Sequence, residues 1–123
     1  MLMDDKTTTV AELKTLVATF CQERDWEQFH DPKNLVMALA SEIGELADVF
    51  RWVSNEKSRA TAVDKEIAES VAHELADVVM FAFEFASVCG IDVASAIESK
   101  LKINAERYPI DKAKGSIVKY NRL

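Results

Sequence analysis

The sequence predicts an all-α fold, a four-helix bundle formed by a single domain. Apolar residues make up 49% of the 123 residues, with only three glycines and two prolines, a composition typical of a helical globular protein. In four segments the apolar residues recur with the period of an amphipathic helix. A chain of this length can build one core but not two, so we expect one domain over residues 1–123.

The first predicted helix begins at Thr8 or Thr9, either of which can cap it, and runs to about Arg24. Its apolar face is expected to consist of Val10, Leu13, Leu16, Val17 and Phe20. Residues 1–6 are expected to be disordered. The aromatic and polar residues 25–31 interrupt the helical pattern.

The second predicted helix has Asp31 as its cap and Pro32 as its first residue, and it reaches about Val53 or Ser54. Its buried stripe is expected to consist of Leu39, Ile43, Leu46, Phe50 and Val53. Residues 55–63 are polar and lack apolar periodicity, so we expect a loop there.

Asp64 can cap a third helix, which runs to Cys89 and is stopped by Gly90. Its buried stripe is expected to consist of Val71, Leu75, Val78, Val79, Ala82 and Ala86. A fourth helix, capped by Asp92, is expected over residues 93–107. Pro109 ends it, and residues 109–123 are expected to form an irregular basic tail.

The second half of the third helix, residues 78–88, is apolar on nearly every side. A bundle of this size has too little mass to cover such a helix all round, so a second chain is expected to cover it. We therefore predict that dimerisation completes the bundle, giving a homodimer or a homotetramer arranged as a dimer of dimers.

The net charge of −6 argues against a protein that binds a nucleic-acid polymer, which would normally show a basic face. The charge is uneven: residues 1–99 hold 8 Lys/Arg against 19 Asp/Glu, and residues 100–123 hold 7 against 2. An acidic body followed by a basic tail suits a small polyanion such as a nucleoside triphosphate. Alternatively, the tail only pairs with the acidic body.

Cys21 and Cys89 lack metal-ligand or redox spacing and are interpreted as reduced core residues of a cytoplasmic protein. Residues 1–10 carry two acidic residues and no long apolar run, so no signal peptide is expected. The apolar run at 78–83 is too short to span a membrane, and Glu84 interrupts its continuation. We therefore expect no membrane association.

Two acidic pairs are the main chemical signal: Glu42 with Glu45, and Glu74 with Asp77. Residues three apart on a helix point the same way, and each pair lies along a flank of its apolar stripe, whereas Glu84 is expected to point away. Packing the two stripes together could bring four carboxylates around one point. Because such groups repel one another, a divalent cation would explain them; the alternative is that both pairs are simply solvated.

All-oxygen ligation favours Mg²⁺, or Mn²⁺, as the metal. A di-iron bundle would need a Glu-x-x-His motif on two helices, whereas Glu45 and Asp77 stand in the histidine positions here. The zinc protease motif His-Glu-x-x-His lacks its second histidine in this chain. Both histidines are therefore interpreted as non-ligands.

Aromatic residues accompany the acidic pairs. Trp52 follows Glu45 by seven residues, or two helical turns, and Phe81 follows Glu74 by the same interval. Trp26 precedes the second helix in the irregular segment, where Phe29 and His30 also lie. A nucleotide needs this combination, with its base on the rings and its phosphates on the cations. The alternative is that these aromatic side chains close the ends of a bundle core.

Several short motifs follow one another along the chain: Arg24-Asp25-Trp26-Glu27-Gln28-Phe29-His30, Glu42-Ile43-Gly44-Glu45-Leu46-Ala47, Phe50-Arg51-Trp52, Glu74-Leu75-Ala76-Asp77-Val78, Asn104-Ala105-Glu106-Arg107-Tyr108-Pro109, Gly115-Ser116 and Lys119-Tyr120. In this order they resemble the all-α nucleoside triphosphate pyrophosphohydrolases of the MazG type, with the closest likeness to the dCTP pyrophosphatase subgroup. The resemblance covers about residues 17–120. Many MazG proteins have Glu-Glu-x-x-Glu where this chain starts with Ser41, and the dCTP-pyrophosphatase-like members also lack that first Glu.

The resemblance implies Mg²⁺-dependent cleavage of a nucleoside triphosphate between its α and β phosphates, giving the monophosphate and pyrophosphate. It implies a role in cleansing the nucleotide pool. The four carboxylates (Glu42, Glu45, Glu74, Asp77) would hold the metal, and Glu45 could accept a proton from the attacking water.

The remaining predicted site residues would bind the substrate. Lys100, Asn104, Arg107 and Tyr108 are candidates to hold the outer phosphates or the sugar, and Trp26, His30 and Trp52 to form the base pocket. The base itself is left open: dCTP is favoured, and dUTP or modified purine nucleotides are alternatives. A different class of function, a non-catalytic helical interaction or regulatory protein, would leave the acidic pairs solvated.

Overall fold

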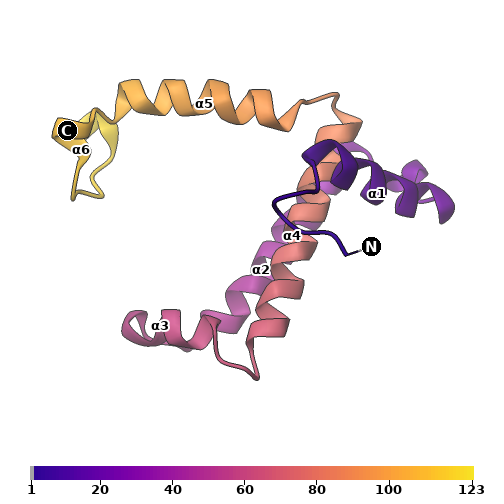
Figure 1. Ribbon diagram of the computed structural model, residues 1–123, viewed down its shortest axis with the longest axis horizontal. Helices are drawn as coiled ribbons and strands as arrows, with labels where there is room; N and C mark the ends of the chain where they lie inside the picture. Colours follow the sequence, from indigo (N-terminus) through magenta and orange to yellow (C-terminus); the bar gives the residue numbers. More distant parts are fainter. Residues whose placement is uncertain (1) are drawn as a thin grey trace. The chain divides into compact units, whose positions relative to one another are not determined.

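The computed structural model describes residues 2–123, which form helices and no strand, and this confirms the predicted all-α class (Figure 1). The helices are α1 (Val10–Glu23), α2 (Pro32–Phe50), α3 (Asn55–Ala62), α4 (Ala68–Val88), α5 (Val93–Arg107) and α6 (Ile110–Ala113), with 3-10 turns η1 (Glu27–Phe29) and η2 (Tyr120–Arg122). The chain divides into two compact units, Met1–Gly90 and Ile91–Leu123. The single domain and the disorder of residues 1–6 stay predictions, and residue 1 lies outside the described range.

Helix α1 begins where the sequence predicted, because Thr9 and Glu12 cap it reciprocally. The Glu12 backbone N–H donates to Thr9 Oγ1 at 3.1 Å, and the Thr9 N–H donates to Glu12 Oε2 at 2.8 Å. After α1 the chain turns through Asp25, whose φ of 54° lies in the left-handed region that aspartate tolerates better than most residues. This turn directs the chain into η1 and then into α2.

Helix α2 opens at Pro32 behind an extended Asp31, as predicted, but it ends at Phe50, earlier than expected. The predicted loop over residues 55–63 is wrong, since α3 occupies Asn55–Ala62. This helix is polar on all sides, so apolar periodicity could not reveal it, although residues such as Ala60 favour helix.

Helix α4 begins at Ala68, later than the predicted start at Asp64. Asp64 instead organises the preceding turn: its carboxylate accepts the Glu66 N–H at 2.9 Å and its carbonyl accepts the Ala68 N–H at 2.7 Å. The end is as predicted, because α4 stops at Val88 and Gly90 adopts a φ of 66° that favours glycine.

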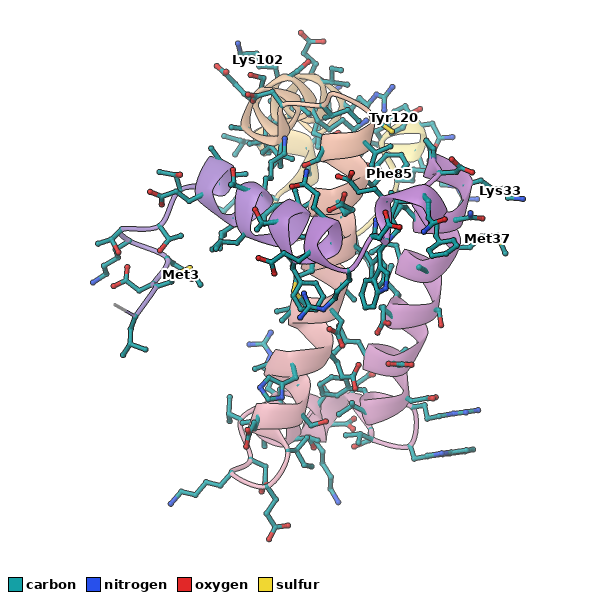
Figure 2. All side chains as sticks on the ribbon, turned by 90° about the vertical axis from the view of Figure 1, so that its right-hand side faces the viewer. Met3, Lys33, Met37, Phe85, Lys102 and Tyr120 are labelled. Atoms are coloured by element: carbon teal, nitrogen blue, oxygen red, sulfur yellow. The ribbon has the colours of Figure 1, made fainter. Side chains whose placement is uncertain are left out.

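The core of the first unit lies where α2 runs beside α4 and where α1 crosses α4 (Figure 1). Leu35, Cys21 and Ala86 are buried there. The predicted stripes are only partly right within one chain, since Ile43 and Leu75 are half-exposed. Figure 2 shows Lys33 and Met37 of α2 pointing outward.

Exposed apolar side chains continue along α4. Val79, Met80 and Val88 are each more than a third exposed in the single chain, whereas Phe81, Phe83 and Phe85 are only partly accessible. Dimerisation through this helix stays a prediction. Within residues 2–123 no single helix is long and apolar enough to cross a membrane; only α4 and α5 taken together, as an interrupted pair, reach the required length and hydropathy.

The second unit starts with α5, whose cap is the predicted one: Asp92 Oδ1 accepts the Ser95 N–H at 2.8 Å. The helix ends at Arg107 as expected. The tail is not wholly irregular, because α6 and η2 interrupt it. The Tyr108 and Tyr120 rings meet edge to face at 5.9 Å, and they hold the tail near the end of α5.

Candidate active site

Three carboxylates from two helices meet in the first unit. Glu42 and Glu45 lie one turn apart on α2, and Glu74 faces them from α4. Each offers an oxygen, and these three oxygens lie within 4.8 Å of one another. This acidic cluster (Glu42, Glu45, Glu74) brings together three of the four carboxylates predicted to converge.

The acidic cluster is electrostatically unfavourable without a cation. Burial raises the pKa of Glu42, and the hydrogen bond to Glu45 and the charges of Glu45, Asp77 and Glu74 raise it further. Burial and the neighbouring Glu45 and Asp77 likewise raise the pKa of Glu74. One oxygen of Glu42 and one of Glu74 are buried and have no hydrogen-bond partner among the described residues. An oxygen-binding cation would fit this donor set, because it would satisfy both oxygens and offset the repulsion.

Asp77, the fourth predicted ligand, lies one turn after Glu74 on α4 but outside the group within 4.8 Å. It is nevertheless close enough for its charge to raise the pKa of both Glu42 and Glu74. Asp77 also lines a neighbouring cavity. It therefore connects the acidic cluster to that cavity.

The cavity has a volume of about 290 Å³ and is walled by α1, the segment before α2, and α4. Its apolar and aromatic lining consists of Val17, Phe20, Trp26, Met80 and Phe81. The Phe20 and Trp26 rings meet edge to face with centroids 5.7 Å apart. Trp26 and His30, both predicted to form a base pocket, do line one cavity, and Phe81 joins them.

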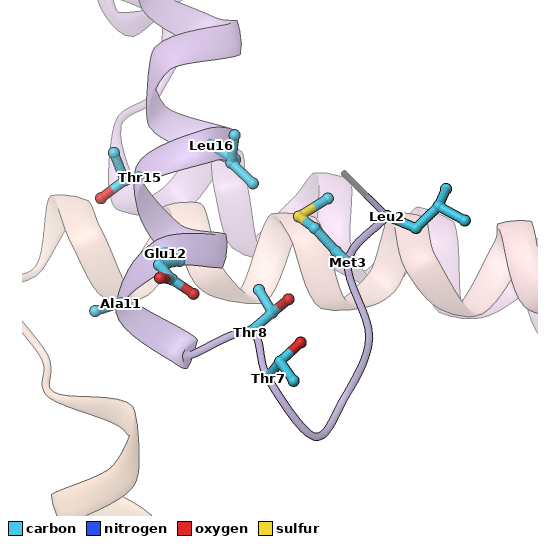
Figure 3. Close-up of a pocket in the computed structure, with 8 residues that line it drawn as sticks. All are labelled: Leu2, Met3, Thr7, Thr8, Ala11, Glu12, Thr15 and Leu16. Atoms are coloured by element: carbon cyan, nitrogen blue, oxygen red, sulfur yellow. The ribbon is translucent and has the colours of Figure 1, made fainter.

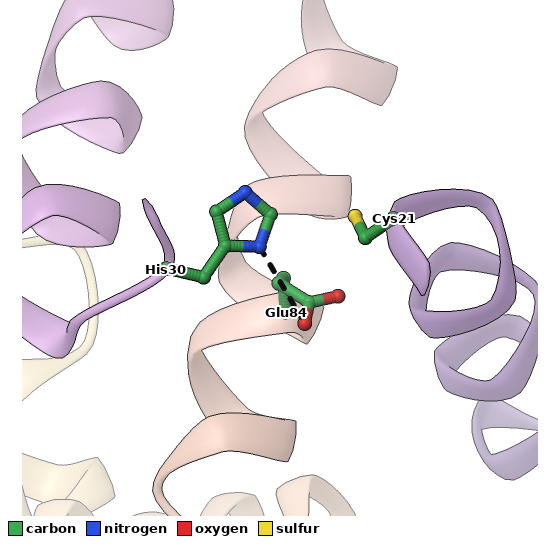
Figure 4. Close-up of side chains that lie close together, drawn as sticks. All are labelled: Cys21, His30 and Glu84. Carbon is green, nitrogen blue, oxygen red and sulfur yellow. Dashed lines mark ion pairs between the residues drawn. The ribbon is translucent and has the colours of Figure 1, made fainter. Parts of the chain in front are cut away.

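The polar end of this cavity was not predicted. Figure 4 shows Cys21 from α1, His30 from the segment before α2, and Glu84 from α4 converging. The distance from His30 Nδ1 to Glu84 Oε1 is 3.8 Å, longer than a hydrogen bond. His30 Nδ1 and Glu84 Oε2 are both buried without a hydrogen-bond partner among the described residues.

The prediction that Glu84 points away from the flank of Glu74 and Asp77 is wrong, since Glu84 lines the same cavity as Asp77 and is only 4% exposed. α1 and the residues that follow it cover this side of α4, so a position expected at the surface is enclosed. Its spacing could have revealed it, because Glu84 follows Asp77 by seven residues and therefore lies on the same side of the helix.

The two cysteines have different environments. Cys21 is buried, as predicted for a core residue, and it lies beside a carboxylate. Burial, and then the charge of Glu84 and a hydrogen bond to it, raise the pKa of the Cys21 thiol to about 11. Cys89 is exposed, so its assignment to the core is wrong.

Trp52, predicted as a wall of the base pocket, is not among the residues that line this cavity. It is 86% exposed in the single chain, and the Arg51 guanidinium lies 4.9 Å from its ring centre. The alternative that Trp52 fills the core of this chain is therefore wrong.

The predicted phosphate- and sugar-binding residues (Lys100, Asn104, Arg107, Tyr108) belong to the second unit. There the Arg107 guanidinium lies 4.8 Å from the centre of the Tyr120 ring, and Tyr108 packs against the same ring. Asn104 is half-buried. Their approach to the acidic cluster stays a prediction.

A second hollow, of about 640 Å³, lies beside the start of α1 (Figure 3). Leu2 and Met3 form one side of it, opposite side chains of α1 such as Leu16. Its one titratable side chain, Glu12, is engaged in the cap of α1. This hollow brings no reactive groups together, so the acidic cluster with its cavity is the candidate site.

Comparison with known proteins identifies the family of this chain. The MazG-like family model matches residues 37–123. The chain is 39% identical over 115 residues to dCTP pyrophosphatase 1 of Rattus norvegicus and 38% identical to that of Homo sapiens, covering 94% of this chain and 68% of each relative. It is 32% identical over 102 residues to a dATP/dGTP diphosphohydrolase of Cyanophage S-2L, covering 80% of this chain and 76% of that protein.

A solved structure is also similar: that of a pyrophosphatase from Archaeoglobus fulgidus, with a TM-score of 0.77 and 26% identity. The match covers 88% of this chain and 99% of the other. The family resemblance predicted from the motifs is thereby confirmed. The chain belongs to the MazG-like family of nucleoside triphosphate pyrophosphohydrolases.

Proposed function

We propose that this enzyme hydrolyses a deoxynucleoside triphosphate, with dCTP favoured, to the monophosphate and pyrophosphate in a Mg²⁺-dependent reaction. The observation that carries the proposal is the acidic cluster lying beside an aromatic cavity, with Asp77 between them. Mammalian relatives named dCTP pyrophosphatase 1 support the choice of substrate. Such an activity would cleanse the nucleotide pool.

The acidic cluster and Asp77 would hold the metal, since they supply oxygen donors of which two are buried and unpartnered. Mg²⁺, or Mn²⁺ in its place, would neutralise phosphate charge and lower the pKa of a bound water. Glu45 is the most exposed member of the acidic cluster, and neither of its oxygens is among those that are buried without a partner. It is therefore our candidate to accept the proton of the attacking water.

The cavity would bind the base. Trp26 and Phe81 supply aromatic faces, and a base stacked on them would lie beside Asp77 and hence near phosphates held at the acidic cluster. Trp52 would contribute a further wall from outside this cavity. Lys100, Asn104, Arg107 and Tyr108 would contact the outer phosphates or the sugar.

A substrate panel tests the proposal. The purified chain is incubated with Mg²⁺ and each of dCTP, dATP, dGTP, dTTP and dUTP, and pyrophosphate and orthophosphate are measured separately. We expect pyrophosphate and the monophosphate in equal amounts, no orthophosphate, and no reaction in excess EDTA. Orthophosphate as the product would contradict cleavage between the α and β phosphates.

A second substrate class follows from one relative, the dATP/dGTP diphosphohydrolase of Cyanophage S-2L. The same panel, extended by triphosphates of modified purine deoxynucleosides, decides between pyrimidine substrates such as dUTP and purine substrates. A non-catalytic interaction protein would release no pyrophosphate from any of them. Its melting temperature would also not rise with Mg²⁺ and dCTP.

We also propose that the enzyme acts in the cytoplasm as a homodimer or homotetramer, with no nucleic-acid polymer or membrane as partner. The assembly is supported by the partly exposed apolar residues on α4, including Val79 and Met80. Gel filtration with light scattering at low micromolar concentration should give twice or four times the mass of one chain. A folded monomer would contradict this assembly.

A further inference from the structure

Within the proposed function, we infer that Glu84 reads the base: it selects nucleotides whose base carries an amino group next to an unprotonated ring nitrogen, as cytosine and adenine do. The inference rests on the proposed function, because it assigns a role at the polar end of the same cavity. Its own basis is the placement of one buried carboxylate and its neighbours.

Glu84 is placed where a base would end. It lines the same cavity as Asp77 and the aromatic residues Trp26 and Phe81. Seven residues of α4 separate Asp77 from Glu84, which is about 10 Å by helical rise. A nucleotide with its phosphates at the acidic cluster would therefore direct the outer edge of its base toward Glu84.

One oxygen of the Glu84 carboxylate lacks a donor among the described residues. Glu84 is 4% exposed, and its Oε2 has no hydrogen-bond partner. The Cys21 thiol has a hydrogen bond to this carboxylate and His30 Nδ1 lies 3.8 Å from Oε1, so Oε2 is the oxygen left for a ligand. A buried acceptor left without a partner is unfavourable, so a ligand that donates to it is strongly favoured over one that does not.

The chemistry of the base edges then determines the choice. An ionised carboxylate only accepts hydrogen bonds, and the amino group at cytosine N4 or adenine N6 donates. Thymine and uracil present the O4 oxygen at that place, which also accepts and would be repelled. His30, beside Glu84, can donate an N–H to the adjacent ring nitrogen of cytosine or adenine.

The test replaces Glu84 with glutamine, which keeps the shape but can both donate and accept. kcat/KM is measured by pyrophosphate release for dCTP, dATP, dUTP and dTTP. We expect the wild type to favour dCTP or dATP over dUTP by about tenfold to hundredfold, and Glu84→Gln to reduce that ratio at least tenfold. Preference for dCTP alone assigns a 4-aminopyrimidine, and preference for dATP alone assigns a 6-aminopurine; either supports the inference.

Glu69→Gln is the matched control, since Glu69 is an exposed glutamate in the first turn of the same helix. It should leave the ratio unchanged. If Glu84→Gln fails to fold, the wild type still decides: a triphosphate of 2-pyrimidinone deoxynucleoside, which carries hydrogen in place of the amino group, should lose about tenfold in kcat/KM against dCTP. Equal turnover of these two triphosphates would overturn the inference.

Failure of the inference and failure of the proposed function look different. If the proposed function is wrong, no triphosphate yields pyrophosphate. If only the base reading is wrong, pyrophosphate is released and the preference survives Glu84→Gln.

A transition metal could instead bind to Cys21, His30 and Glu84. Stoichiometric Zn²⁺ binding that blocks dCTP turnover and is lost in both Cys21→Ser and Glu84→Gln would overturn the base reading in favour of that site.

Discussion

Helix α4 carries carboxylates in two different settings. Glu74 lies among the acidic side chains of α2, where two buried oxygens lack partners and like charges accumulate. Glu84, about 15 Å further along by helical rise, is a single buried carboxylate beside an imidazole and a thiol. In the proposed function, a cation would stabilise the first setting and a hydrogen-bond donor of the base the second. One helix face can thereby hold the phosphates at one end of a nucleotide and read the base at the other.

The largest effect should come from neutralising the metal-binding end. Glu45→Gln and Asp77→Asn should each lower the rate of pyrophosphate release at least about a hundredfold, because each removes a carboxylate charge from the proposed metal site. Circular dichroism should be unchanged. Glu69→Gln, an exposed change on the same helix, serves as the control. Wild-type rates in both site variants would rule out the role of the acidic cluster.

The next effect is a dependence of stability on pH that comes from the acidic cluster. Burial and neighbouring carboxylates raise the pKa of Glu42 and Glu74 above the ordinary 4.5. A raised pKa means that the folded chain binds these protons more tightly than the unfolded chain. This contribution to stability is therefore full below 4.5 and is lost as the pH rises through the raised pKa values.

In EDTA, the melting temperature should accordingly fall as the pH rises above 4.5, and it should fall more steeply in the wild type than in Glu42→Gln. Mg²⁺ should reverse the fall by binding the ionised carboxylates, and it should do so more at pH 7 than at pH 5. A melting temperature that responds equally to Mg²⁺ in both proteins would show that Glu42 does not contribute to the metal site.

Replacing each tryptophan with alanine compares a ring that lines the cavity, Trp26, with one outside it, Trp52. Trp26→Ala removes a ring that lines the cavity and should raise KM for dCTP by a factor corresponding to about 1–3 kcal/mol of stacking. Trp52→Ala should raise KM similarly if the exposed indole closes on the base. Its melting temperature should change little, because Trp52 is exposed in the single chain. An unchanged KM in Trp52→Ala would remove Trp52 from the base pocket.

The outcome shows which features the sequence could reveal. The ends of α1 and α5 were predictable because Thr9 and Asp92 cap them with their own side chains, a local effect. The convergence of Glu42, Glu45 and Glu74 was predictable because two i,i+3 pairs border two apolar stripes that pack together.

The predictions that failed concern features that local sequence patterns do not reveal. Helix α3 has no apolar face, so periodicity gave no signal for it. Glu84 interrupts an apolar run, and a charged residue in that position is normally assigned to solvent. Only the packing of α1 and the segment before α2 encloses it. The pocket for a base is thus less visible in the sequence than the site for a metal, because several distant segments build it.

The smallest effect concerns the reactivity of the two thiols, Cys21 and Cys89. Cys21 is buried and its pKa is raised to about 11, so it should be nearly inert to a thiol reagent at pH 8, whereas Cys89 is exposed and should react quickly. The native protein should show one fast thiol per chain, and the unfolded protein two. Cys89→Ala should abolish the fast phase.

Glu84→Gln should increase the reaction rate of the Cys21 thiol only slightly, because burial outweighs the charge of Glu84 in raising the pKa of Cys21. Two fast thiols in the native wild type would mean that the polar end of the cavity is open to solvent, and the comparison between the two settings on α4 would no longer hold.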